Sequence, residues 1–371
     1  MKIYLIGQKG IPAKFGGVEK HVEKLATKLV EKGHEVFAYT RPNYTDKKLK
    51  EYRGVKLISL PSIYSKNLDA ITHTLFATID VIFRKADIIH FHSIGPSSLI
   101  WLLKMLKPRT PIISTFHSQC YHHQKWGKFA RIYLKFGEKM ACTKAKELIT
   151  VSKFLQSYAK DKYQRAAKYI PNGVDIPTPL PAKEISERWG LEKDSYFLTV
   201  SRLVKHKGIH YIIEAYNNLK TDKKLVIVGD GAFTDSYVDE LRAQTNNNPN
   251  IILTGNQSGD ILNELFSNAY LFIQASEDEG LSIALLEALS FGLPVLVSDI
   301  PANLETVRNI GFIFKNKDQK SLEDKLRYLV QSSETLEEKR GLGIALMQTE
   351  YNWDNITNDV IEVYYEALKK N

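Results

Sequence analysis

Two successive series of short apolar runs, separated by helical patterns, constrain the fold of this 371-residue chain more than any other feature. The first series lies at 2–6, 35–40, 55–60, 87–91, 111–115 and 147–151. The second series lies at 196–200, 224–228, 250–254, 270–274 and 294–298. Nearly continuous apolar runs are typical of parallel strands covered on both faces, with helices as the crossovers. The sequence therefore predicts an α/β protein with two Rossmann-like, doubly wound parallel sheets.

A stretch rich in Pro, Gly, Asn and Asp separates the two series. This stretch, YIPNGVDIPTPLPAKE at 169–184, is predicted to be an interdomain linker. It divides the chain into domains of about 1–172 and 173–352, in line with a length prior of roughly 150 residues per domain. A last amphipathic helix is predicted from Trp353 onward.

Charge is distributed unevenly between the halves. Residues 1–185 carry 32 Lys and Arg against 14 Asp and Glu, which gives +18, whereas 186–371 carry 19 against 28, which gives −9. Such asymmetry favours a polyanionic partner or an anionic membrane surface for the first half, unless it is only a solvated basic face. No recognised nucleic-acid-binding module accompanies the charge, so nucleic acid is not an expected partner.

The N-terminal segment, the lack of a long apolar run and the small number of cysteines predict a cytoplasmic protein. The apolar run after Lys2 is too short for a signal-peptide core, and nowhere do eighteen apolar residues follow one another. The two cysteines, Cys120 and Cys142, form no CxxC pair and are too few for a disulfide scaffold or a zinc site.

The segment SEDEGLSIALLEALSFGLPVLVSD (276–299) carries the first candidate site. A strand ends near Gln274, acids and Gly280 follow, and a helix is expected from about Ser282. Helix N-terminal amides at the carboxyl edge of a parallel sheet can bind an anion such as a diphosphate. Glu279 precedes this helix, and Glu287 lies about two turns into it on roughly the same side. The alternative to a binding site is that Glu279 is a solvated helix cap and Glu287 is an exposed acid on the helix.

The segment SRLVKHKG (201–208) supplies opposite charge. Arg202 follows a strand directly, Lys207 comes five residues later, and Gly208 lets the backbone turn into a helix. A guanidinium and an ammonium at the carboxyl end of a strand can neutralise a diphosphate. Two surface cations on a loop are the alternative.

Taken together, these segments resemble a retaining glycosyltransferase of the GT-B fold, from family 4. The resemblance covers essentially the whole chain. The N-terminal segment is similar to that of a subgroup of bacterial capsule and polysaccharide transferases that includes rhamnosyltransferases. It rests on the Glu279-x7-Glu287 element, SRLVKHKG, IVGDG (227–231), PNGVD (171–175), ITVSKF (149–154) and GQKGIPAKFGGVEKHVEKLA (7–26). It implies two domains facing a cleft, with the helix at 353–371 packing back on the N-terminal, acceptor-side domain and 173–352 binding the nucleotide sugar.

The resemblance also implies roles for individual residues. Glu279 would contact hydroxyls of the transferred sugar and Glu287 the nucleotide ribose, while Arg202 and Lys207 would hold the diphosphate. His117 would lie near the anomeric centre. The remaining donor-binding residues by resemblance are Gly280, Leu281, Ser282, Ile283, Gly16 and Gly17. One departure is Glu-Gly-Leu-Ser at 279–282, where many members have Glu-Gly-Phe-Gly.

No metal site and no cofactor are expected. His90 and His92 alternate along a strand and share a face, but the sequence offers no third ligand beside them. The acidic trio 277–279 resembles the Asp-x-Asp metal element of GT-A transferases, but that interpretation leaves Arg202 and Lys207 unexplained.

An amphipathic segment, 125–144, combines an apolar and a basic stripe. The apolar stripe comprises Phe129, Ile132, Tyr133, Phe136 and Met140, and the basic stripe Lys128, Arg131, Lys135 and Lys139. A core-facing helix and a peripheral contact with anionic lipid at the inner face of the cell membrane are equally favoured.

The function expected from these observations is transfer of a sugar from a nucleoside-diphosphate sugar to a glycan or polyprenyl-linked acceptor, with retention, in cell-surface polysaccharide biosynthesis. The alternatives are a sugar-nucleotide epimerase of the same fold and a non-catalytic sugar- or lipid-binding protein. A dinucleotide dehydrogenase is disfavoured because neither half has a GxGxxG after its first strand.

Overall fold

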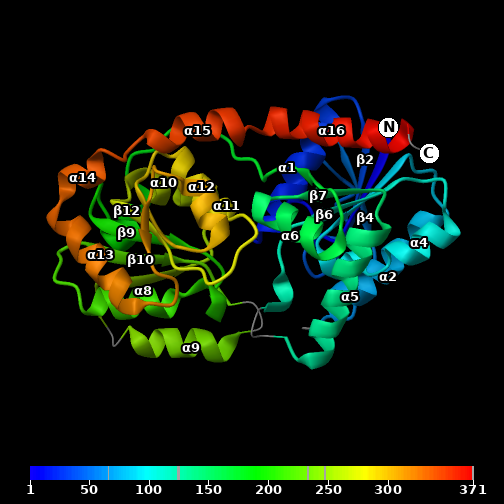
Figure 1. Cartoon of the computed structure of the whole chain (residues 1–371). Helices are drawn as coiled ribbons and strands as arrows, with labels where there is room; N and C mark the ends of the chain where they lie inside the picture. The colour runs from blue at the N-terminus through cyan, green and yellow to red at the C-terminus, as the bar shows by residue number, and fades with distance from the viewer. Residues whose placement is uncertain (66, 123–125, 232–233, 246–247, 370–371) are drawn as a thin grey trace. The chain divides into compact units, whose positions relative to one another are not determined.

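The structure, a computed structural model, describes residues 1–65, 67–122, 126–231, 234–245 and 248–369. Internal contacts divide the chain into two compact units (Figure 1). Unit 1 comprises Met1–His122, Trp126–Asn172 and Trp353–Asn371, and unit 2 contains Gly173–Asn352. Both units consist of parallel sheets flanked by helices, which confirms the predicted fold class.

The sheet of unit 1 has eight strands in the order β3-β4-β2-β1-β5-β6-β7-β8. All neighbours are parallel except β3 and β4. The strands are β1 (Lys2–Ile6), β2 (Glu35–Thr40), β3 (Glu51–Tyr52), β4 (Val55–Ser59), β5 (Ile88–His92), β6 (Ile112–Phe116), β7 (Glu147–Thr150) and β8 (Lys168–Tyr169).

Helices cover both faces of this sheet. Their bounds are α1 (Gly17–Glu31), α2 (Leu68–Ile82), α3 (Ile94–Ser97), α4 (Ile100–Leu106), α5 (Lys128–Lys144), α6 (Lys153–Tyr163) and α16 (Trp353–Lys369), with a short 3₁₀ turn, η1 (Cys120–His122). Alternate residues of β1 point to opposite faces, so Leu5 packs in a core with α1 and α16, whereas Tyr4 packs in a core with α2 and α4. Both layers are therefore needed to bury the central strand.

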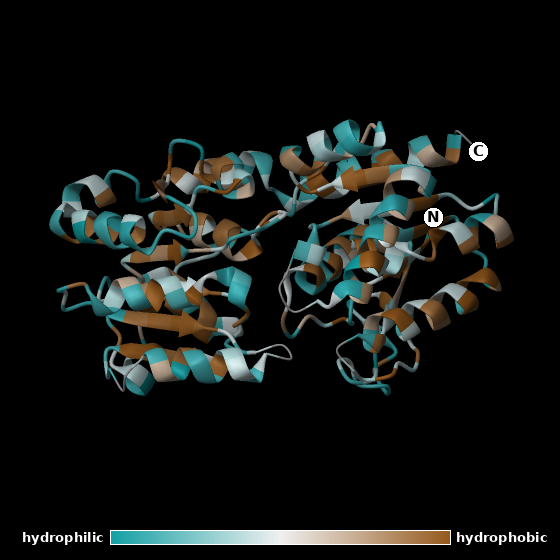
Figure 2. Ribbon diagram, turned by 60° about the horizontal axis from the view of Figure 1, so that its bottom comes forward, coloured by the Kyte–Doolittle hydropathy of each residue, from teal (hydrophilic) through white to brown (hydrophobic). Residues whose placement is uncertain are grey.

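The sheet of unit 2 has six parallel strands in the order β11-β10-β9-β12-β13-β14. They are β9 (Tyr196–Val200), β10 (Lys224–Val228), β11 (Ile251–Gly255), β12 (Leu271–Gln274), β13 (Val295–Ser298) and β14 (Phe312–Phe314). In Figure 2 strands of this sheet are brown, that is hydrophobic, and the helices around them mix brown and teal. This pattern is expected where each helix buries only one side.

The helices of unit 2 divide in the same way between two cores. Phe197 of β9 packs with α8, α9 and α13, and its neighbour Leu198 packs with α7, α10, α11 and α15. The bounds are α7 (Glu184–Trp189), α8 (Ile209–Asn217), α9 (Asp235–Gln244), α10 (Gly259–Asn268), α11 (Ile283–Ser290), α12 (Pro301–Val307), α13 (Gln319–Gln331), α14 (Ser333–Glu337) and α15 (Leu342–Glu350), with the 3₁₀ turn η2 (Lys205–Lys207).

Most of the segment predicted as a linker is part of unit 2. The backbone N–H of Val174 donates to the carbonyl of Tyr351 at 2.8 Å, and that of Leu180 donates to the Ser267 hydroxyl at 2.9 Å. The chain therefore passes between the units at Asn172 and Gly173, and hydrogen bonds at Val174 and Leu180 hold the stretch that follows to the rest of unit 2.

Three short strands were not predicted from the sequence: β3, β8 and β14. They have two or three residues each, and none is a fully buried apolar run. Each lies at an edge of its sheet, where pairing with one neighbour needs no continuous apolar pattern.

Candidate functional site

Arg202 and Lys207 lie on the loop that leaves the carboxyl end of β9. This strand is central in the sheet of unit 2, next to β12. Gly208, with φ +67°, turns the chain from η2 into α8, and a Cβ at this position would lie 2.1 Å from the carbonyl oxygen of Ala275. Only glycine permits this approach, which brings the Lys207 loop against the segment that follows β12.

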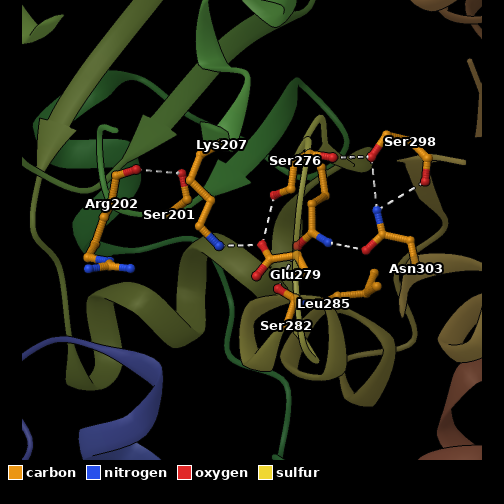
Figure 3. A network of polar contacts seen from close by, with 10 residues as sticks. Ser201, Arg202, Lys207, Ser276, Glu279, Ser282, Leu285, Ser298 and Asn303 are labelled. Atoms are coloured by element: carbon orange, nitrogen blue, oxygen red, sulfur yellow. Dashed lines mark hydrogen bonds and ion pairs between the residues drawn. The ribbon is translucent and has the colours of Figure 1, made fainter. Parts of the chain in front are cut away.

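Glu279 lies on that neighbouring segment, between β12 and α11. Its carboxylate accepts a hydrogen bond from the Ser276 hydroxyl at 2.8 Å and forms an ion pair with the Lys207 ammonium (Figure 3). The side chains of Lys207 and Glu279 are only 14% and 12% exposed. The two predicted site residues therefore meet, and the charge of each neutralises that of the other.

Arg202 behaves differently from Lys207. Within the described part of the chain its guanidinium makes no hydrogen bond or ion pair, and Figure 3 shows it beside the Lys207–Glu279 pair without a dashed contact. It is half-buried. A partly desolvated guanidinium with unused donors is available to bind a phosphate oxygen pair.

A buried hydrogen-bond network holds the loop between β12 and α11. The Ser282 hydroxyl caps α11 by accepting from the N–H of Leu285 at 3.3 Å, and it donates to the Gln274 side-chain oxygen at 2.6 Å. The Gln274 amide donates in turn to Asn303, at 2.7 Å. Asn303 donates to the Ser298 hydroxyl, which bonds the carbonyl of Ser276. The serine that departs from the family pattern thus has a structural role, because it fixes the start of the helix.

The other residues predicted in this segment surround the helix start. Ile283 is the first residue of α11, and Glu287 lies one turn further on, half-buried. Gly280 is buried and Leu281 is half-buried. The first amides of an α-helix have no partner within the helix, so that of Ile283, the first residue of α11, suits an anion.

Asp278 is the most perturbed acid of the loop. Burial, followed by the neighbouring Glu279 carboxylate, raises the pKa of Asp278 to about 6. The three acids of the trio diverge, since Glu277 pairs with Lys317 at 3.3 Å and accepts from the Tyr211 hydroxyl at 3.1 Å. The contacts of Glu277 and Glu279 are therefore with different partners, and the trio does not form a common ligand set.

In unit 1, four histidines gather where β5 and β6 end. His92 Nδ1 lies 3.2 Å from His117 Nε2, and His90 bonds Tyr364 and Thr115, at 2.7 Å each. The ring of His21, from α1, lies 4.9 Å from that of His117. Burial lowers the pKa of His21 to about 4 and that of His90 to about 3, and it holds those of His92 and His117 well below the usual range. All four rings are neutral at pH 7.

The expectation that no third ligand lies beside His92 is wrong. The ring nitrogens of His21, His92 and His117 lie within 4.8 Å of one another, the one group among the described residues whose geometry could hold a metal ion. The sequence does not indicate His21 as a possible ligand, because it lies within the apolar pattern of α1, between Val18 and Leu25. That no metal is needed stays a prediction.

Gly16 and Gly17 lie at the start of α1. Gly16 has φ +102°, and a Cβ there would lie 2.1 Å from a Glu19 carboxylate oxygen, so glycine is required by the backbone. Gly17 is the first residue of the helix. The N–H of Lys9, from the same predicted loop, donates to Glu19 at 3.2 Å.

The helix predicted at 125–144 is α5, and three of the five residues of its apolar stripe are exposed. Phe129 is 91% exposed, Ile132 65% and Phe136 42%, whereas Met140 is buried. The core side of α5 is instead formed by Leu134, Gly137, Ala141 and Cys142. Lys125 lies outside the described residues. The core-facing interpretation of the stripe is therefore wrong for Phe129, Ile132 and Phe136, whereas Tyr133 is half-buried.

Two family models match the chain, one in each half. Residues 15–177 match Glycosyltransferase Family 4, and residues 181–340 match Glycosyl transferases group 1. Among curated proteins, an uncharacterized glycosyltransferase of Methanocaldococcus jannaschii is 26% identical over 100% of this chain and 99% of its own length. The UDP-Gal:alpha-D-GlcNAc-diphosphoundecaprenol alpha-1,3-galactosyltransferase of Escherichia coli is 31% identical over 63% of this chain and 64% of its own length.

Solved structures agree on the fold. Anabaena HepE in complex with UDP and glucose has a TM-score of 0.81 and 18% identity, with 99% of this chain and 100% of HepE covered. Sucrose-phosphate synthase from Thermosynechococcus elongatus has a TM-score of 0.84 and 18% identity, over 100% of both chains. With both halves matched by glycosyltransferase models and the whole fold shared with GT-B enzymes, the chain is a glycosyltransferase of the GT-B fold, similar to group 1 and Family 4.

Proposed function

We propose that the enzyme transfers a sugar from a nucleoside-diphosphate sugar to a glycan or lipid-linked acceptor, with retention of anomeric configuration. The observation that carries the proposal is the ion pair between Lys207 and Glu279 at the carboxyl ends of two neighbouring strands, with Arg202 on the same loop as Lys207. Guanidinium and ammonium groups suit a diphosphate, and a carboxylate suits sugar hydroxyls. The Escherichia coli relative is named for a UDP-sugar and a diphosphoundecaprenol substrate.

In the proposed reaction the bond between the anomeric carbon and the diphosphate oxygen breaks, and its electron pair leaves with the nucleoside diphosphate. The acceptor hydroxyl oxygen bonds the anomeric carbon from the same face, and its proton passes to the leaving diphosphate. Arg202 and Lys207 stabilise the charge that develops on the leaving group. Donor binding would divide the present ion pair, with the Lys207 ammonium turning to phosphate and the Glu279 carboxylate to sugar hydroxyls.

The remaining site residues keep the roles that the family resemblance implies. Glu287 binds the ribose, and the amides from Gly280 to Ile283 approach sugar and phosphate. For unit 1, the resemblance implies that His117 would lie near the anomeric centre and that the loop with Gly16 and Gly17 would close against the donor. Arg202 and Lys207 already supply positive charge for the diphosphate, so transfer is expected to continue in excess EDTA.

Donor binding is tested with a thermal-shift panel of nucleoside diphosphates and sugar nucleotides. A ligand at 100 times its dissociation constant should stabilise the native state by about 2.7 kcal/mol. Product configuration, from NMR coupling constants, should equal that of the donor. An inverted product would contradict retention and make His117 a candidate base. Incubating the donor without an acceptor tests for an epimerase, which would convert the sugar nucleotide itself.

We also propose a peripheral contact of unit 1 with the anionic inner face of the cell membrane. None of the described helices is long and apolar enough to span a bilayer. Phe129 and Ile132 project from α5 into solvent, and the only acid of α5, Glu138, is buried, where it accepts hydrogen bonds from Tyr163 and Lys162. An exposed apolar face flanked only by cations is the pattern of a helix that lies at an anionic membrane surface.

Exposed apolar side chains also occur on or beside the neighbouring helices α4 and α2. α4 contacts both α2 and α5, and its Met105 is 66% exposed; Phe83, just after α2, is 84% exposed. The contact is tested by liposome sedimentation, which should rise with the anionic lipid fraction and fall with salt, because exposed charges are screened beyond about 10 Å at 0.1 M.

Variants of equal charge separate a specific contact from net charge. Each Lys or Arg near the surface contributes about 1 kcal/mol, so replacing four of them should release the protein. The test variant changes Lys128, Arg131, Lys135 and Lys139 to Ser. The control changes Lys32, Lys47, Lys48 and Lys50, which are exposed outside α2, α4 and α5. Equal release by both variants would contradict docking through α5.

A further inference from the structure

A cavity of about 530 Å³ lies within unit 1 between α2, α3 and the first two turns of α5. It reaches the carboxyl edge of the sheet, where Gly7 and Ser93 follow β1 and β5. It is also lined by Phe129, the side chain that is 91% exposed. The cavity therefore connects the edge where parallel sheets bind substrates with the exposed apolar face of α5.

The lining is mostly carbon. Ala70 and Ile71 contribute from α2, Pro96 from α3, and Ala130 and Leu134 from α5. Tyr133 adds its ring, because its hydroxyl is already bonded to that of Ser98 at 2.5 Å. Such a cavity favours a hydrocarbon and has the volume of a small-molecule site.

One cationic side chain lines this mostly apolar cavity. Lys128, the first residue of α5, lines the cavity and is exposed. Arg131 and Lys135 lie on the exposed side of the same helix. A ligand with a long apolar chain and an anionic group near one end matches both features, since the chain is desolvated while the anion keeps a cationic, hydrated neighbour.

We infer that this cavity binds the hydrocarbon chain of a lipid-phosphate acceptor next to its phosphate, with the rest of the chain leaving past Phe129. This inference rests on the proposed function, because it chooses the lipid-linked class over a soluble glycan. The acceptor sugar then lies toward Gly7 and Ser93, at the edge where β5 ends with His92 and His117 follows β6.

Trp126 lines the cavity and provides a direct signal. The probe is farnesyl monophosphate, and isopentenyl monophosphate, which has the same head group and ten fewer carbons, is its control. Because each buried methylene contributes about fourfold in affinity, the farnesyl compound should bind at least a hundredfold more tightly by tryptophan fluorescence. A Trp126→Phe variant should lose the signal, while competition with a labelled prenyl phosphate still reports binding.

Filling the cavity provides the decisive variant. Ala130→Phe places a ring in the cavity from an exposed helix turn and should weaken farnesyl phosphate at least tenfold. Thr143→Phe adds the same bulk to an exposed position of α5 outside the cavity and should leave binding unchanged. Ala70→Leu fills the cavity from α2 and serves if Ala130→Phe does not fold. Equal affinity of the two probes, or unchanged binding in a folded cavity-filling variant, would overturn the inference.

Measuring sugar transfer separately from prenyl-phosphate binding distinguishes this inference from the proposed function. In one outcome, affinity for the prenyl phosphates depends on the length of the hydrocarbon and is lost in Ala130→Phe, but no sugar is transferred. This outcome would support the cavity and contradict the proposed function. Transfer to a soluble glycan that farnesyl phosphate neither binds nor inhibits would support the function and contradict the cavity.

Discussion

The side chains at the carboxyl edges of the two sheets differ in charge. In unit 2 the edge carries charge, because Arg202, Lys207 and Glu279 lie at the ends of β9 and β12 and remain partly exposed. In unit 1 the edge carries neutral rings, because burial keeps the imidazoles at the ends of β5 and β6 unprotonated. A charged edge suits an anionic donor, whereas a neutral edge suits uncharged hydroxyls.

This contrast predicts opposite responses of the two units to pH, and the larger effect is expected in unit 1. The pKa of His21 is about 4 in the folded state, below its ordinary value of 6.5. Between these values the unfolded state binds more protons, so the free energy of unfolding falls as pH decreases from 6.5 to 4. The loss for this one residue is about 3 kcal/mol.

Native-state hydrogen exchange of β5 amides, in the presence of EDTA, measures this loss for unit 1 alone. His21→Gln, which stays neutral, should remove this part of the pH dependence. His122→Gln should remove less of the pH dependence, because His122 is exposed and burial lowers the pKa of its ring less than that of His21. A His21→Gln variant as acid-sensitive as the wild type would show that His21 is not held neutral by its surroundings.

The opposite sign is expected in unit 2, from Asp278. Its pKa is about 6 when folded, above the ordinary 3.8, so the folded state binds the extra proton and stability falls as pH rises from 3.8 to 6. The loss is about 2–3 kcal/mol. Asp278→Asn should therefore exceed wild type in stability at pH 7.5 and match it near pH 4, measured by exchange of β12 amides. An Asn variant less stable at pH 7.5 would contradict this interpretation.

Donor binding should depend on the charged edge alone. Each charged hydrogen bond contributes about 1.5–3 kcal/mol, so Arg202→Ala should weaken donor use by roughly tenfold to a hundredfold. kcat/KM for the donor and the thermal shift with the matching nucleoside diphosphate measure this effect. Arg242→Ala is the control, because Arg242 is exposed on α9 and pairs only locally with Asp239. Equal effects of the two changes would remove Arg202 from the site.

The smallest expected difference concerns two helix caps. Ser152 caps α6 in unit 1 through the N–H of Leu155 at 3.3 Å, and Ser282 caps α11 in unit 2 with the same geometry. Replacing a capping serine by alanine costs about 1 kcal/mol. Ser282→Ala also leaves the buried Gln274 oxygen without its donor, so it should cost about 1 kcal/mol more than Ser152→Ala in denaturant unfolding. Equal costs would show that the Ser282–Gln274 bond has no net value.

Some of the predicted roles of site residues depend on the family resemblance alone. The roles given to Glu287, Gly16 and Gly17 come from matching motifs, and physical patterns in the chain would not single them out. Ser282 shows the limit of such matching, because its function as a helix cap follows from contacts with Gln274 and Leu285 rather than from the family pattern.

The sequence by itself determined the two sheets, their order along the chain and the positions of Arg202, Lys207 and Glu279 after strands. These features depend on local periodicity and on turn residues, which act over a few neighbouring positions. Only the tertiary structure decided that Lys207 pairs with Glu279, that His21 joins His92 and His117, and that Phe129 faces solvent beside a cavity. Those contacts join residues up to 96 positions apart, as between His21 and His117. Packing of separate elements sets such contacts, and the period of an amphipathic helix does not reveal which of its sides will find a partner.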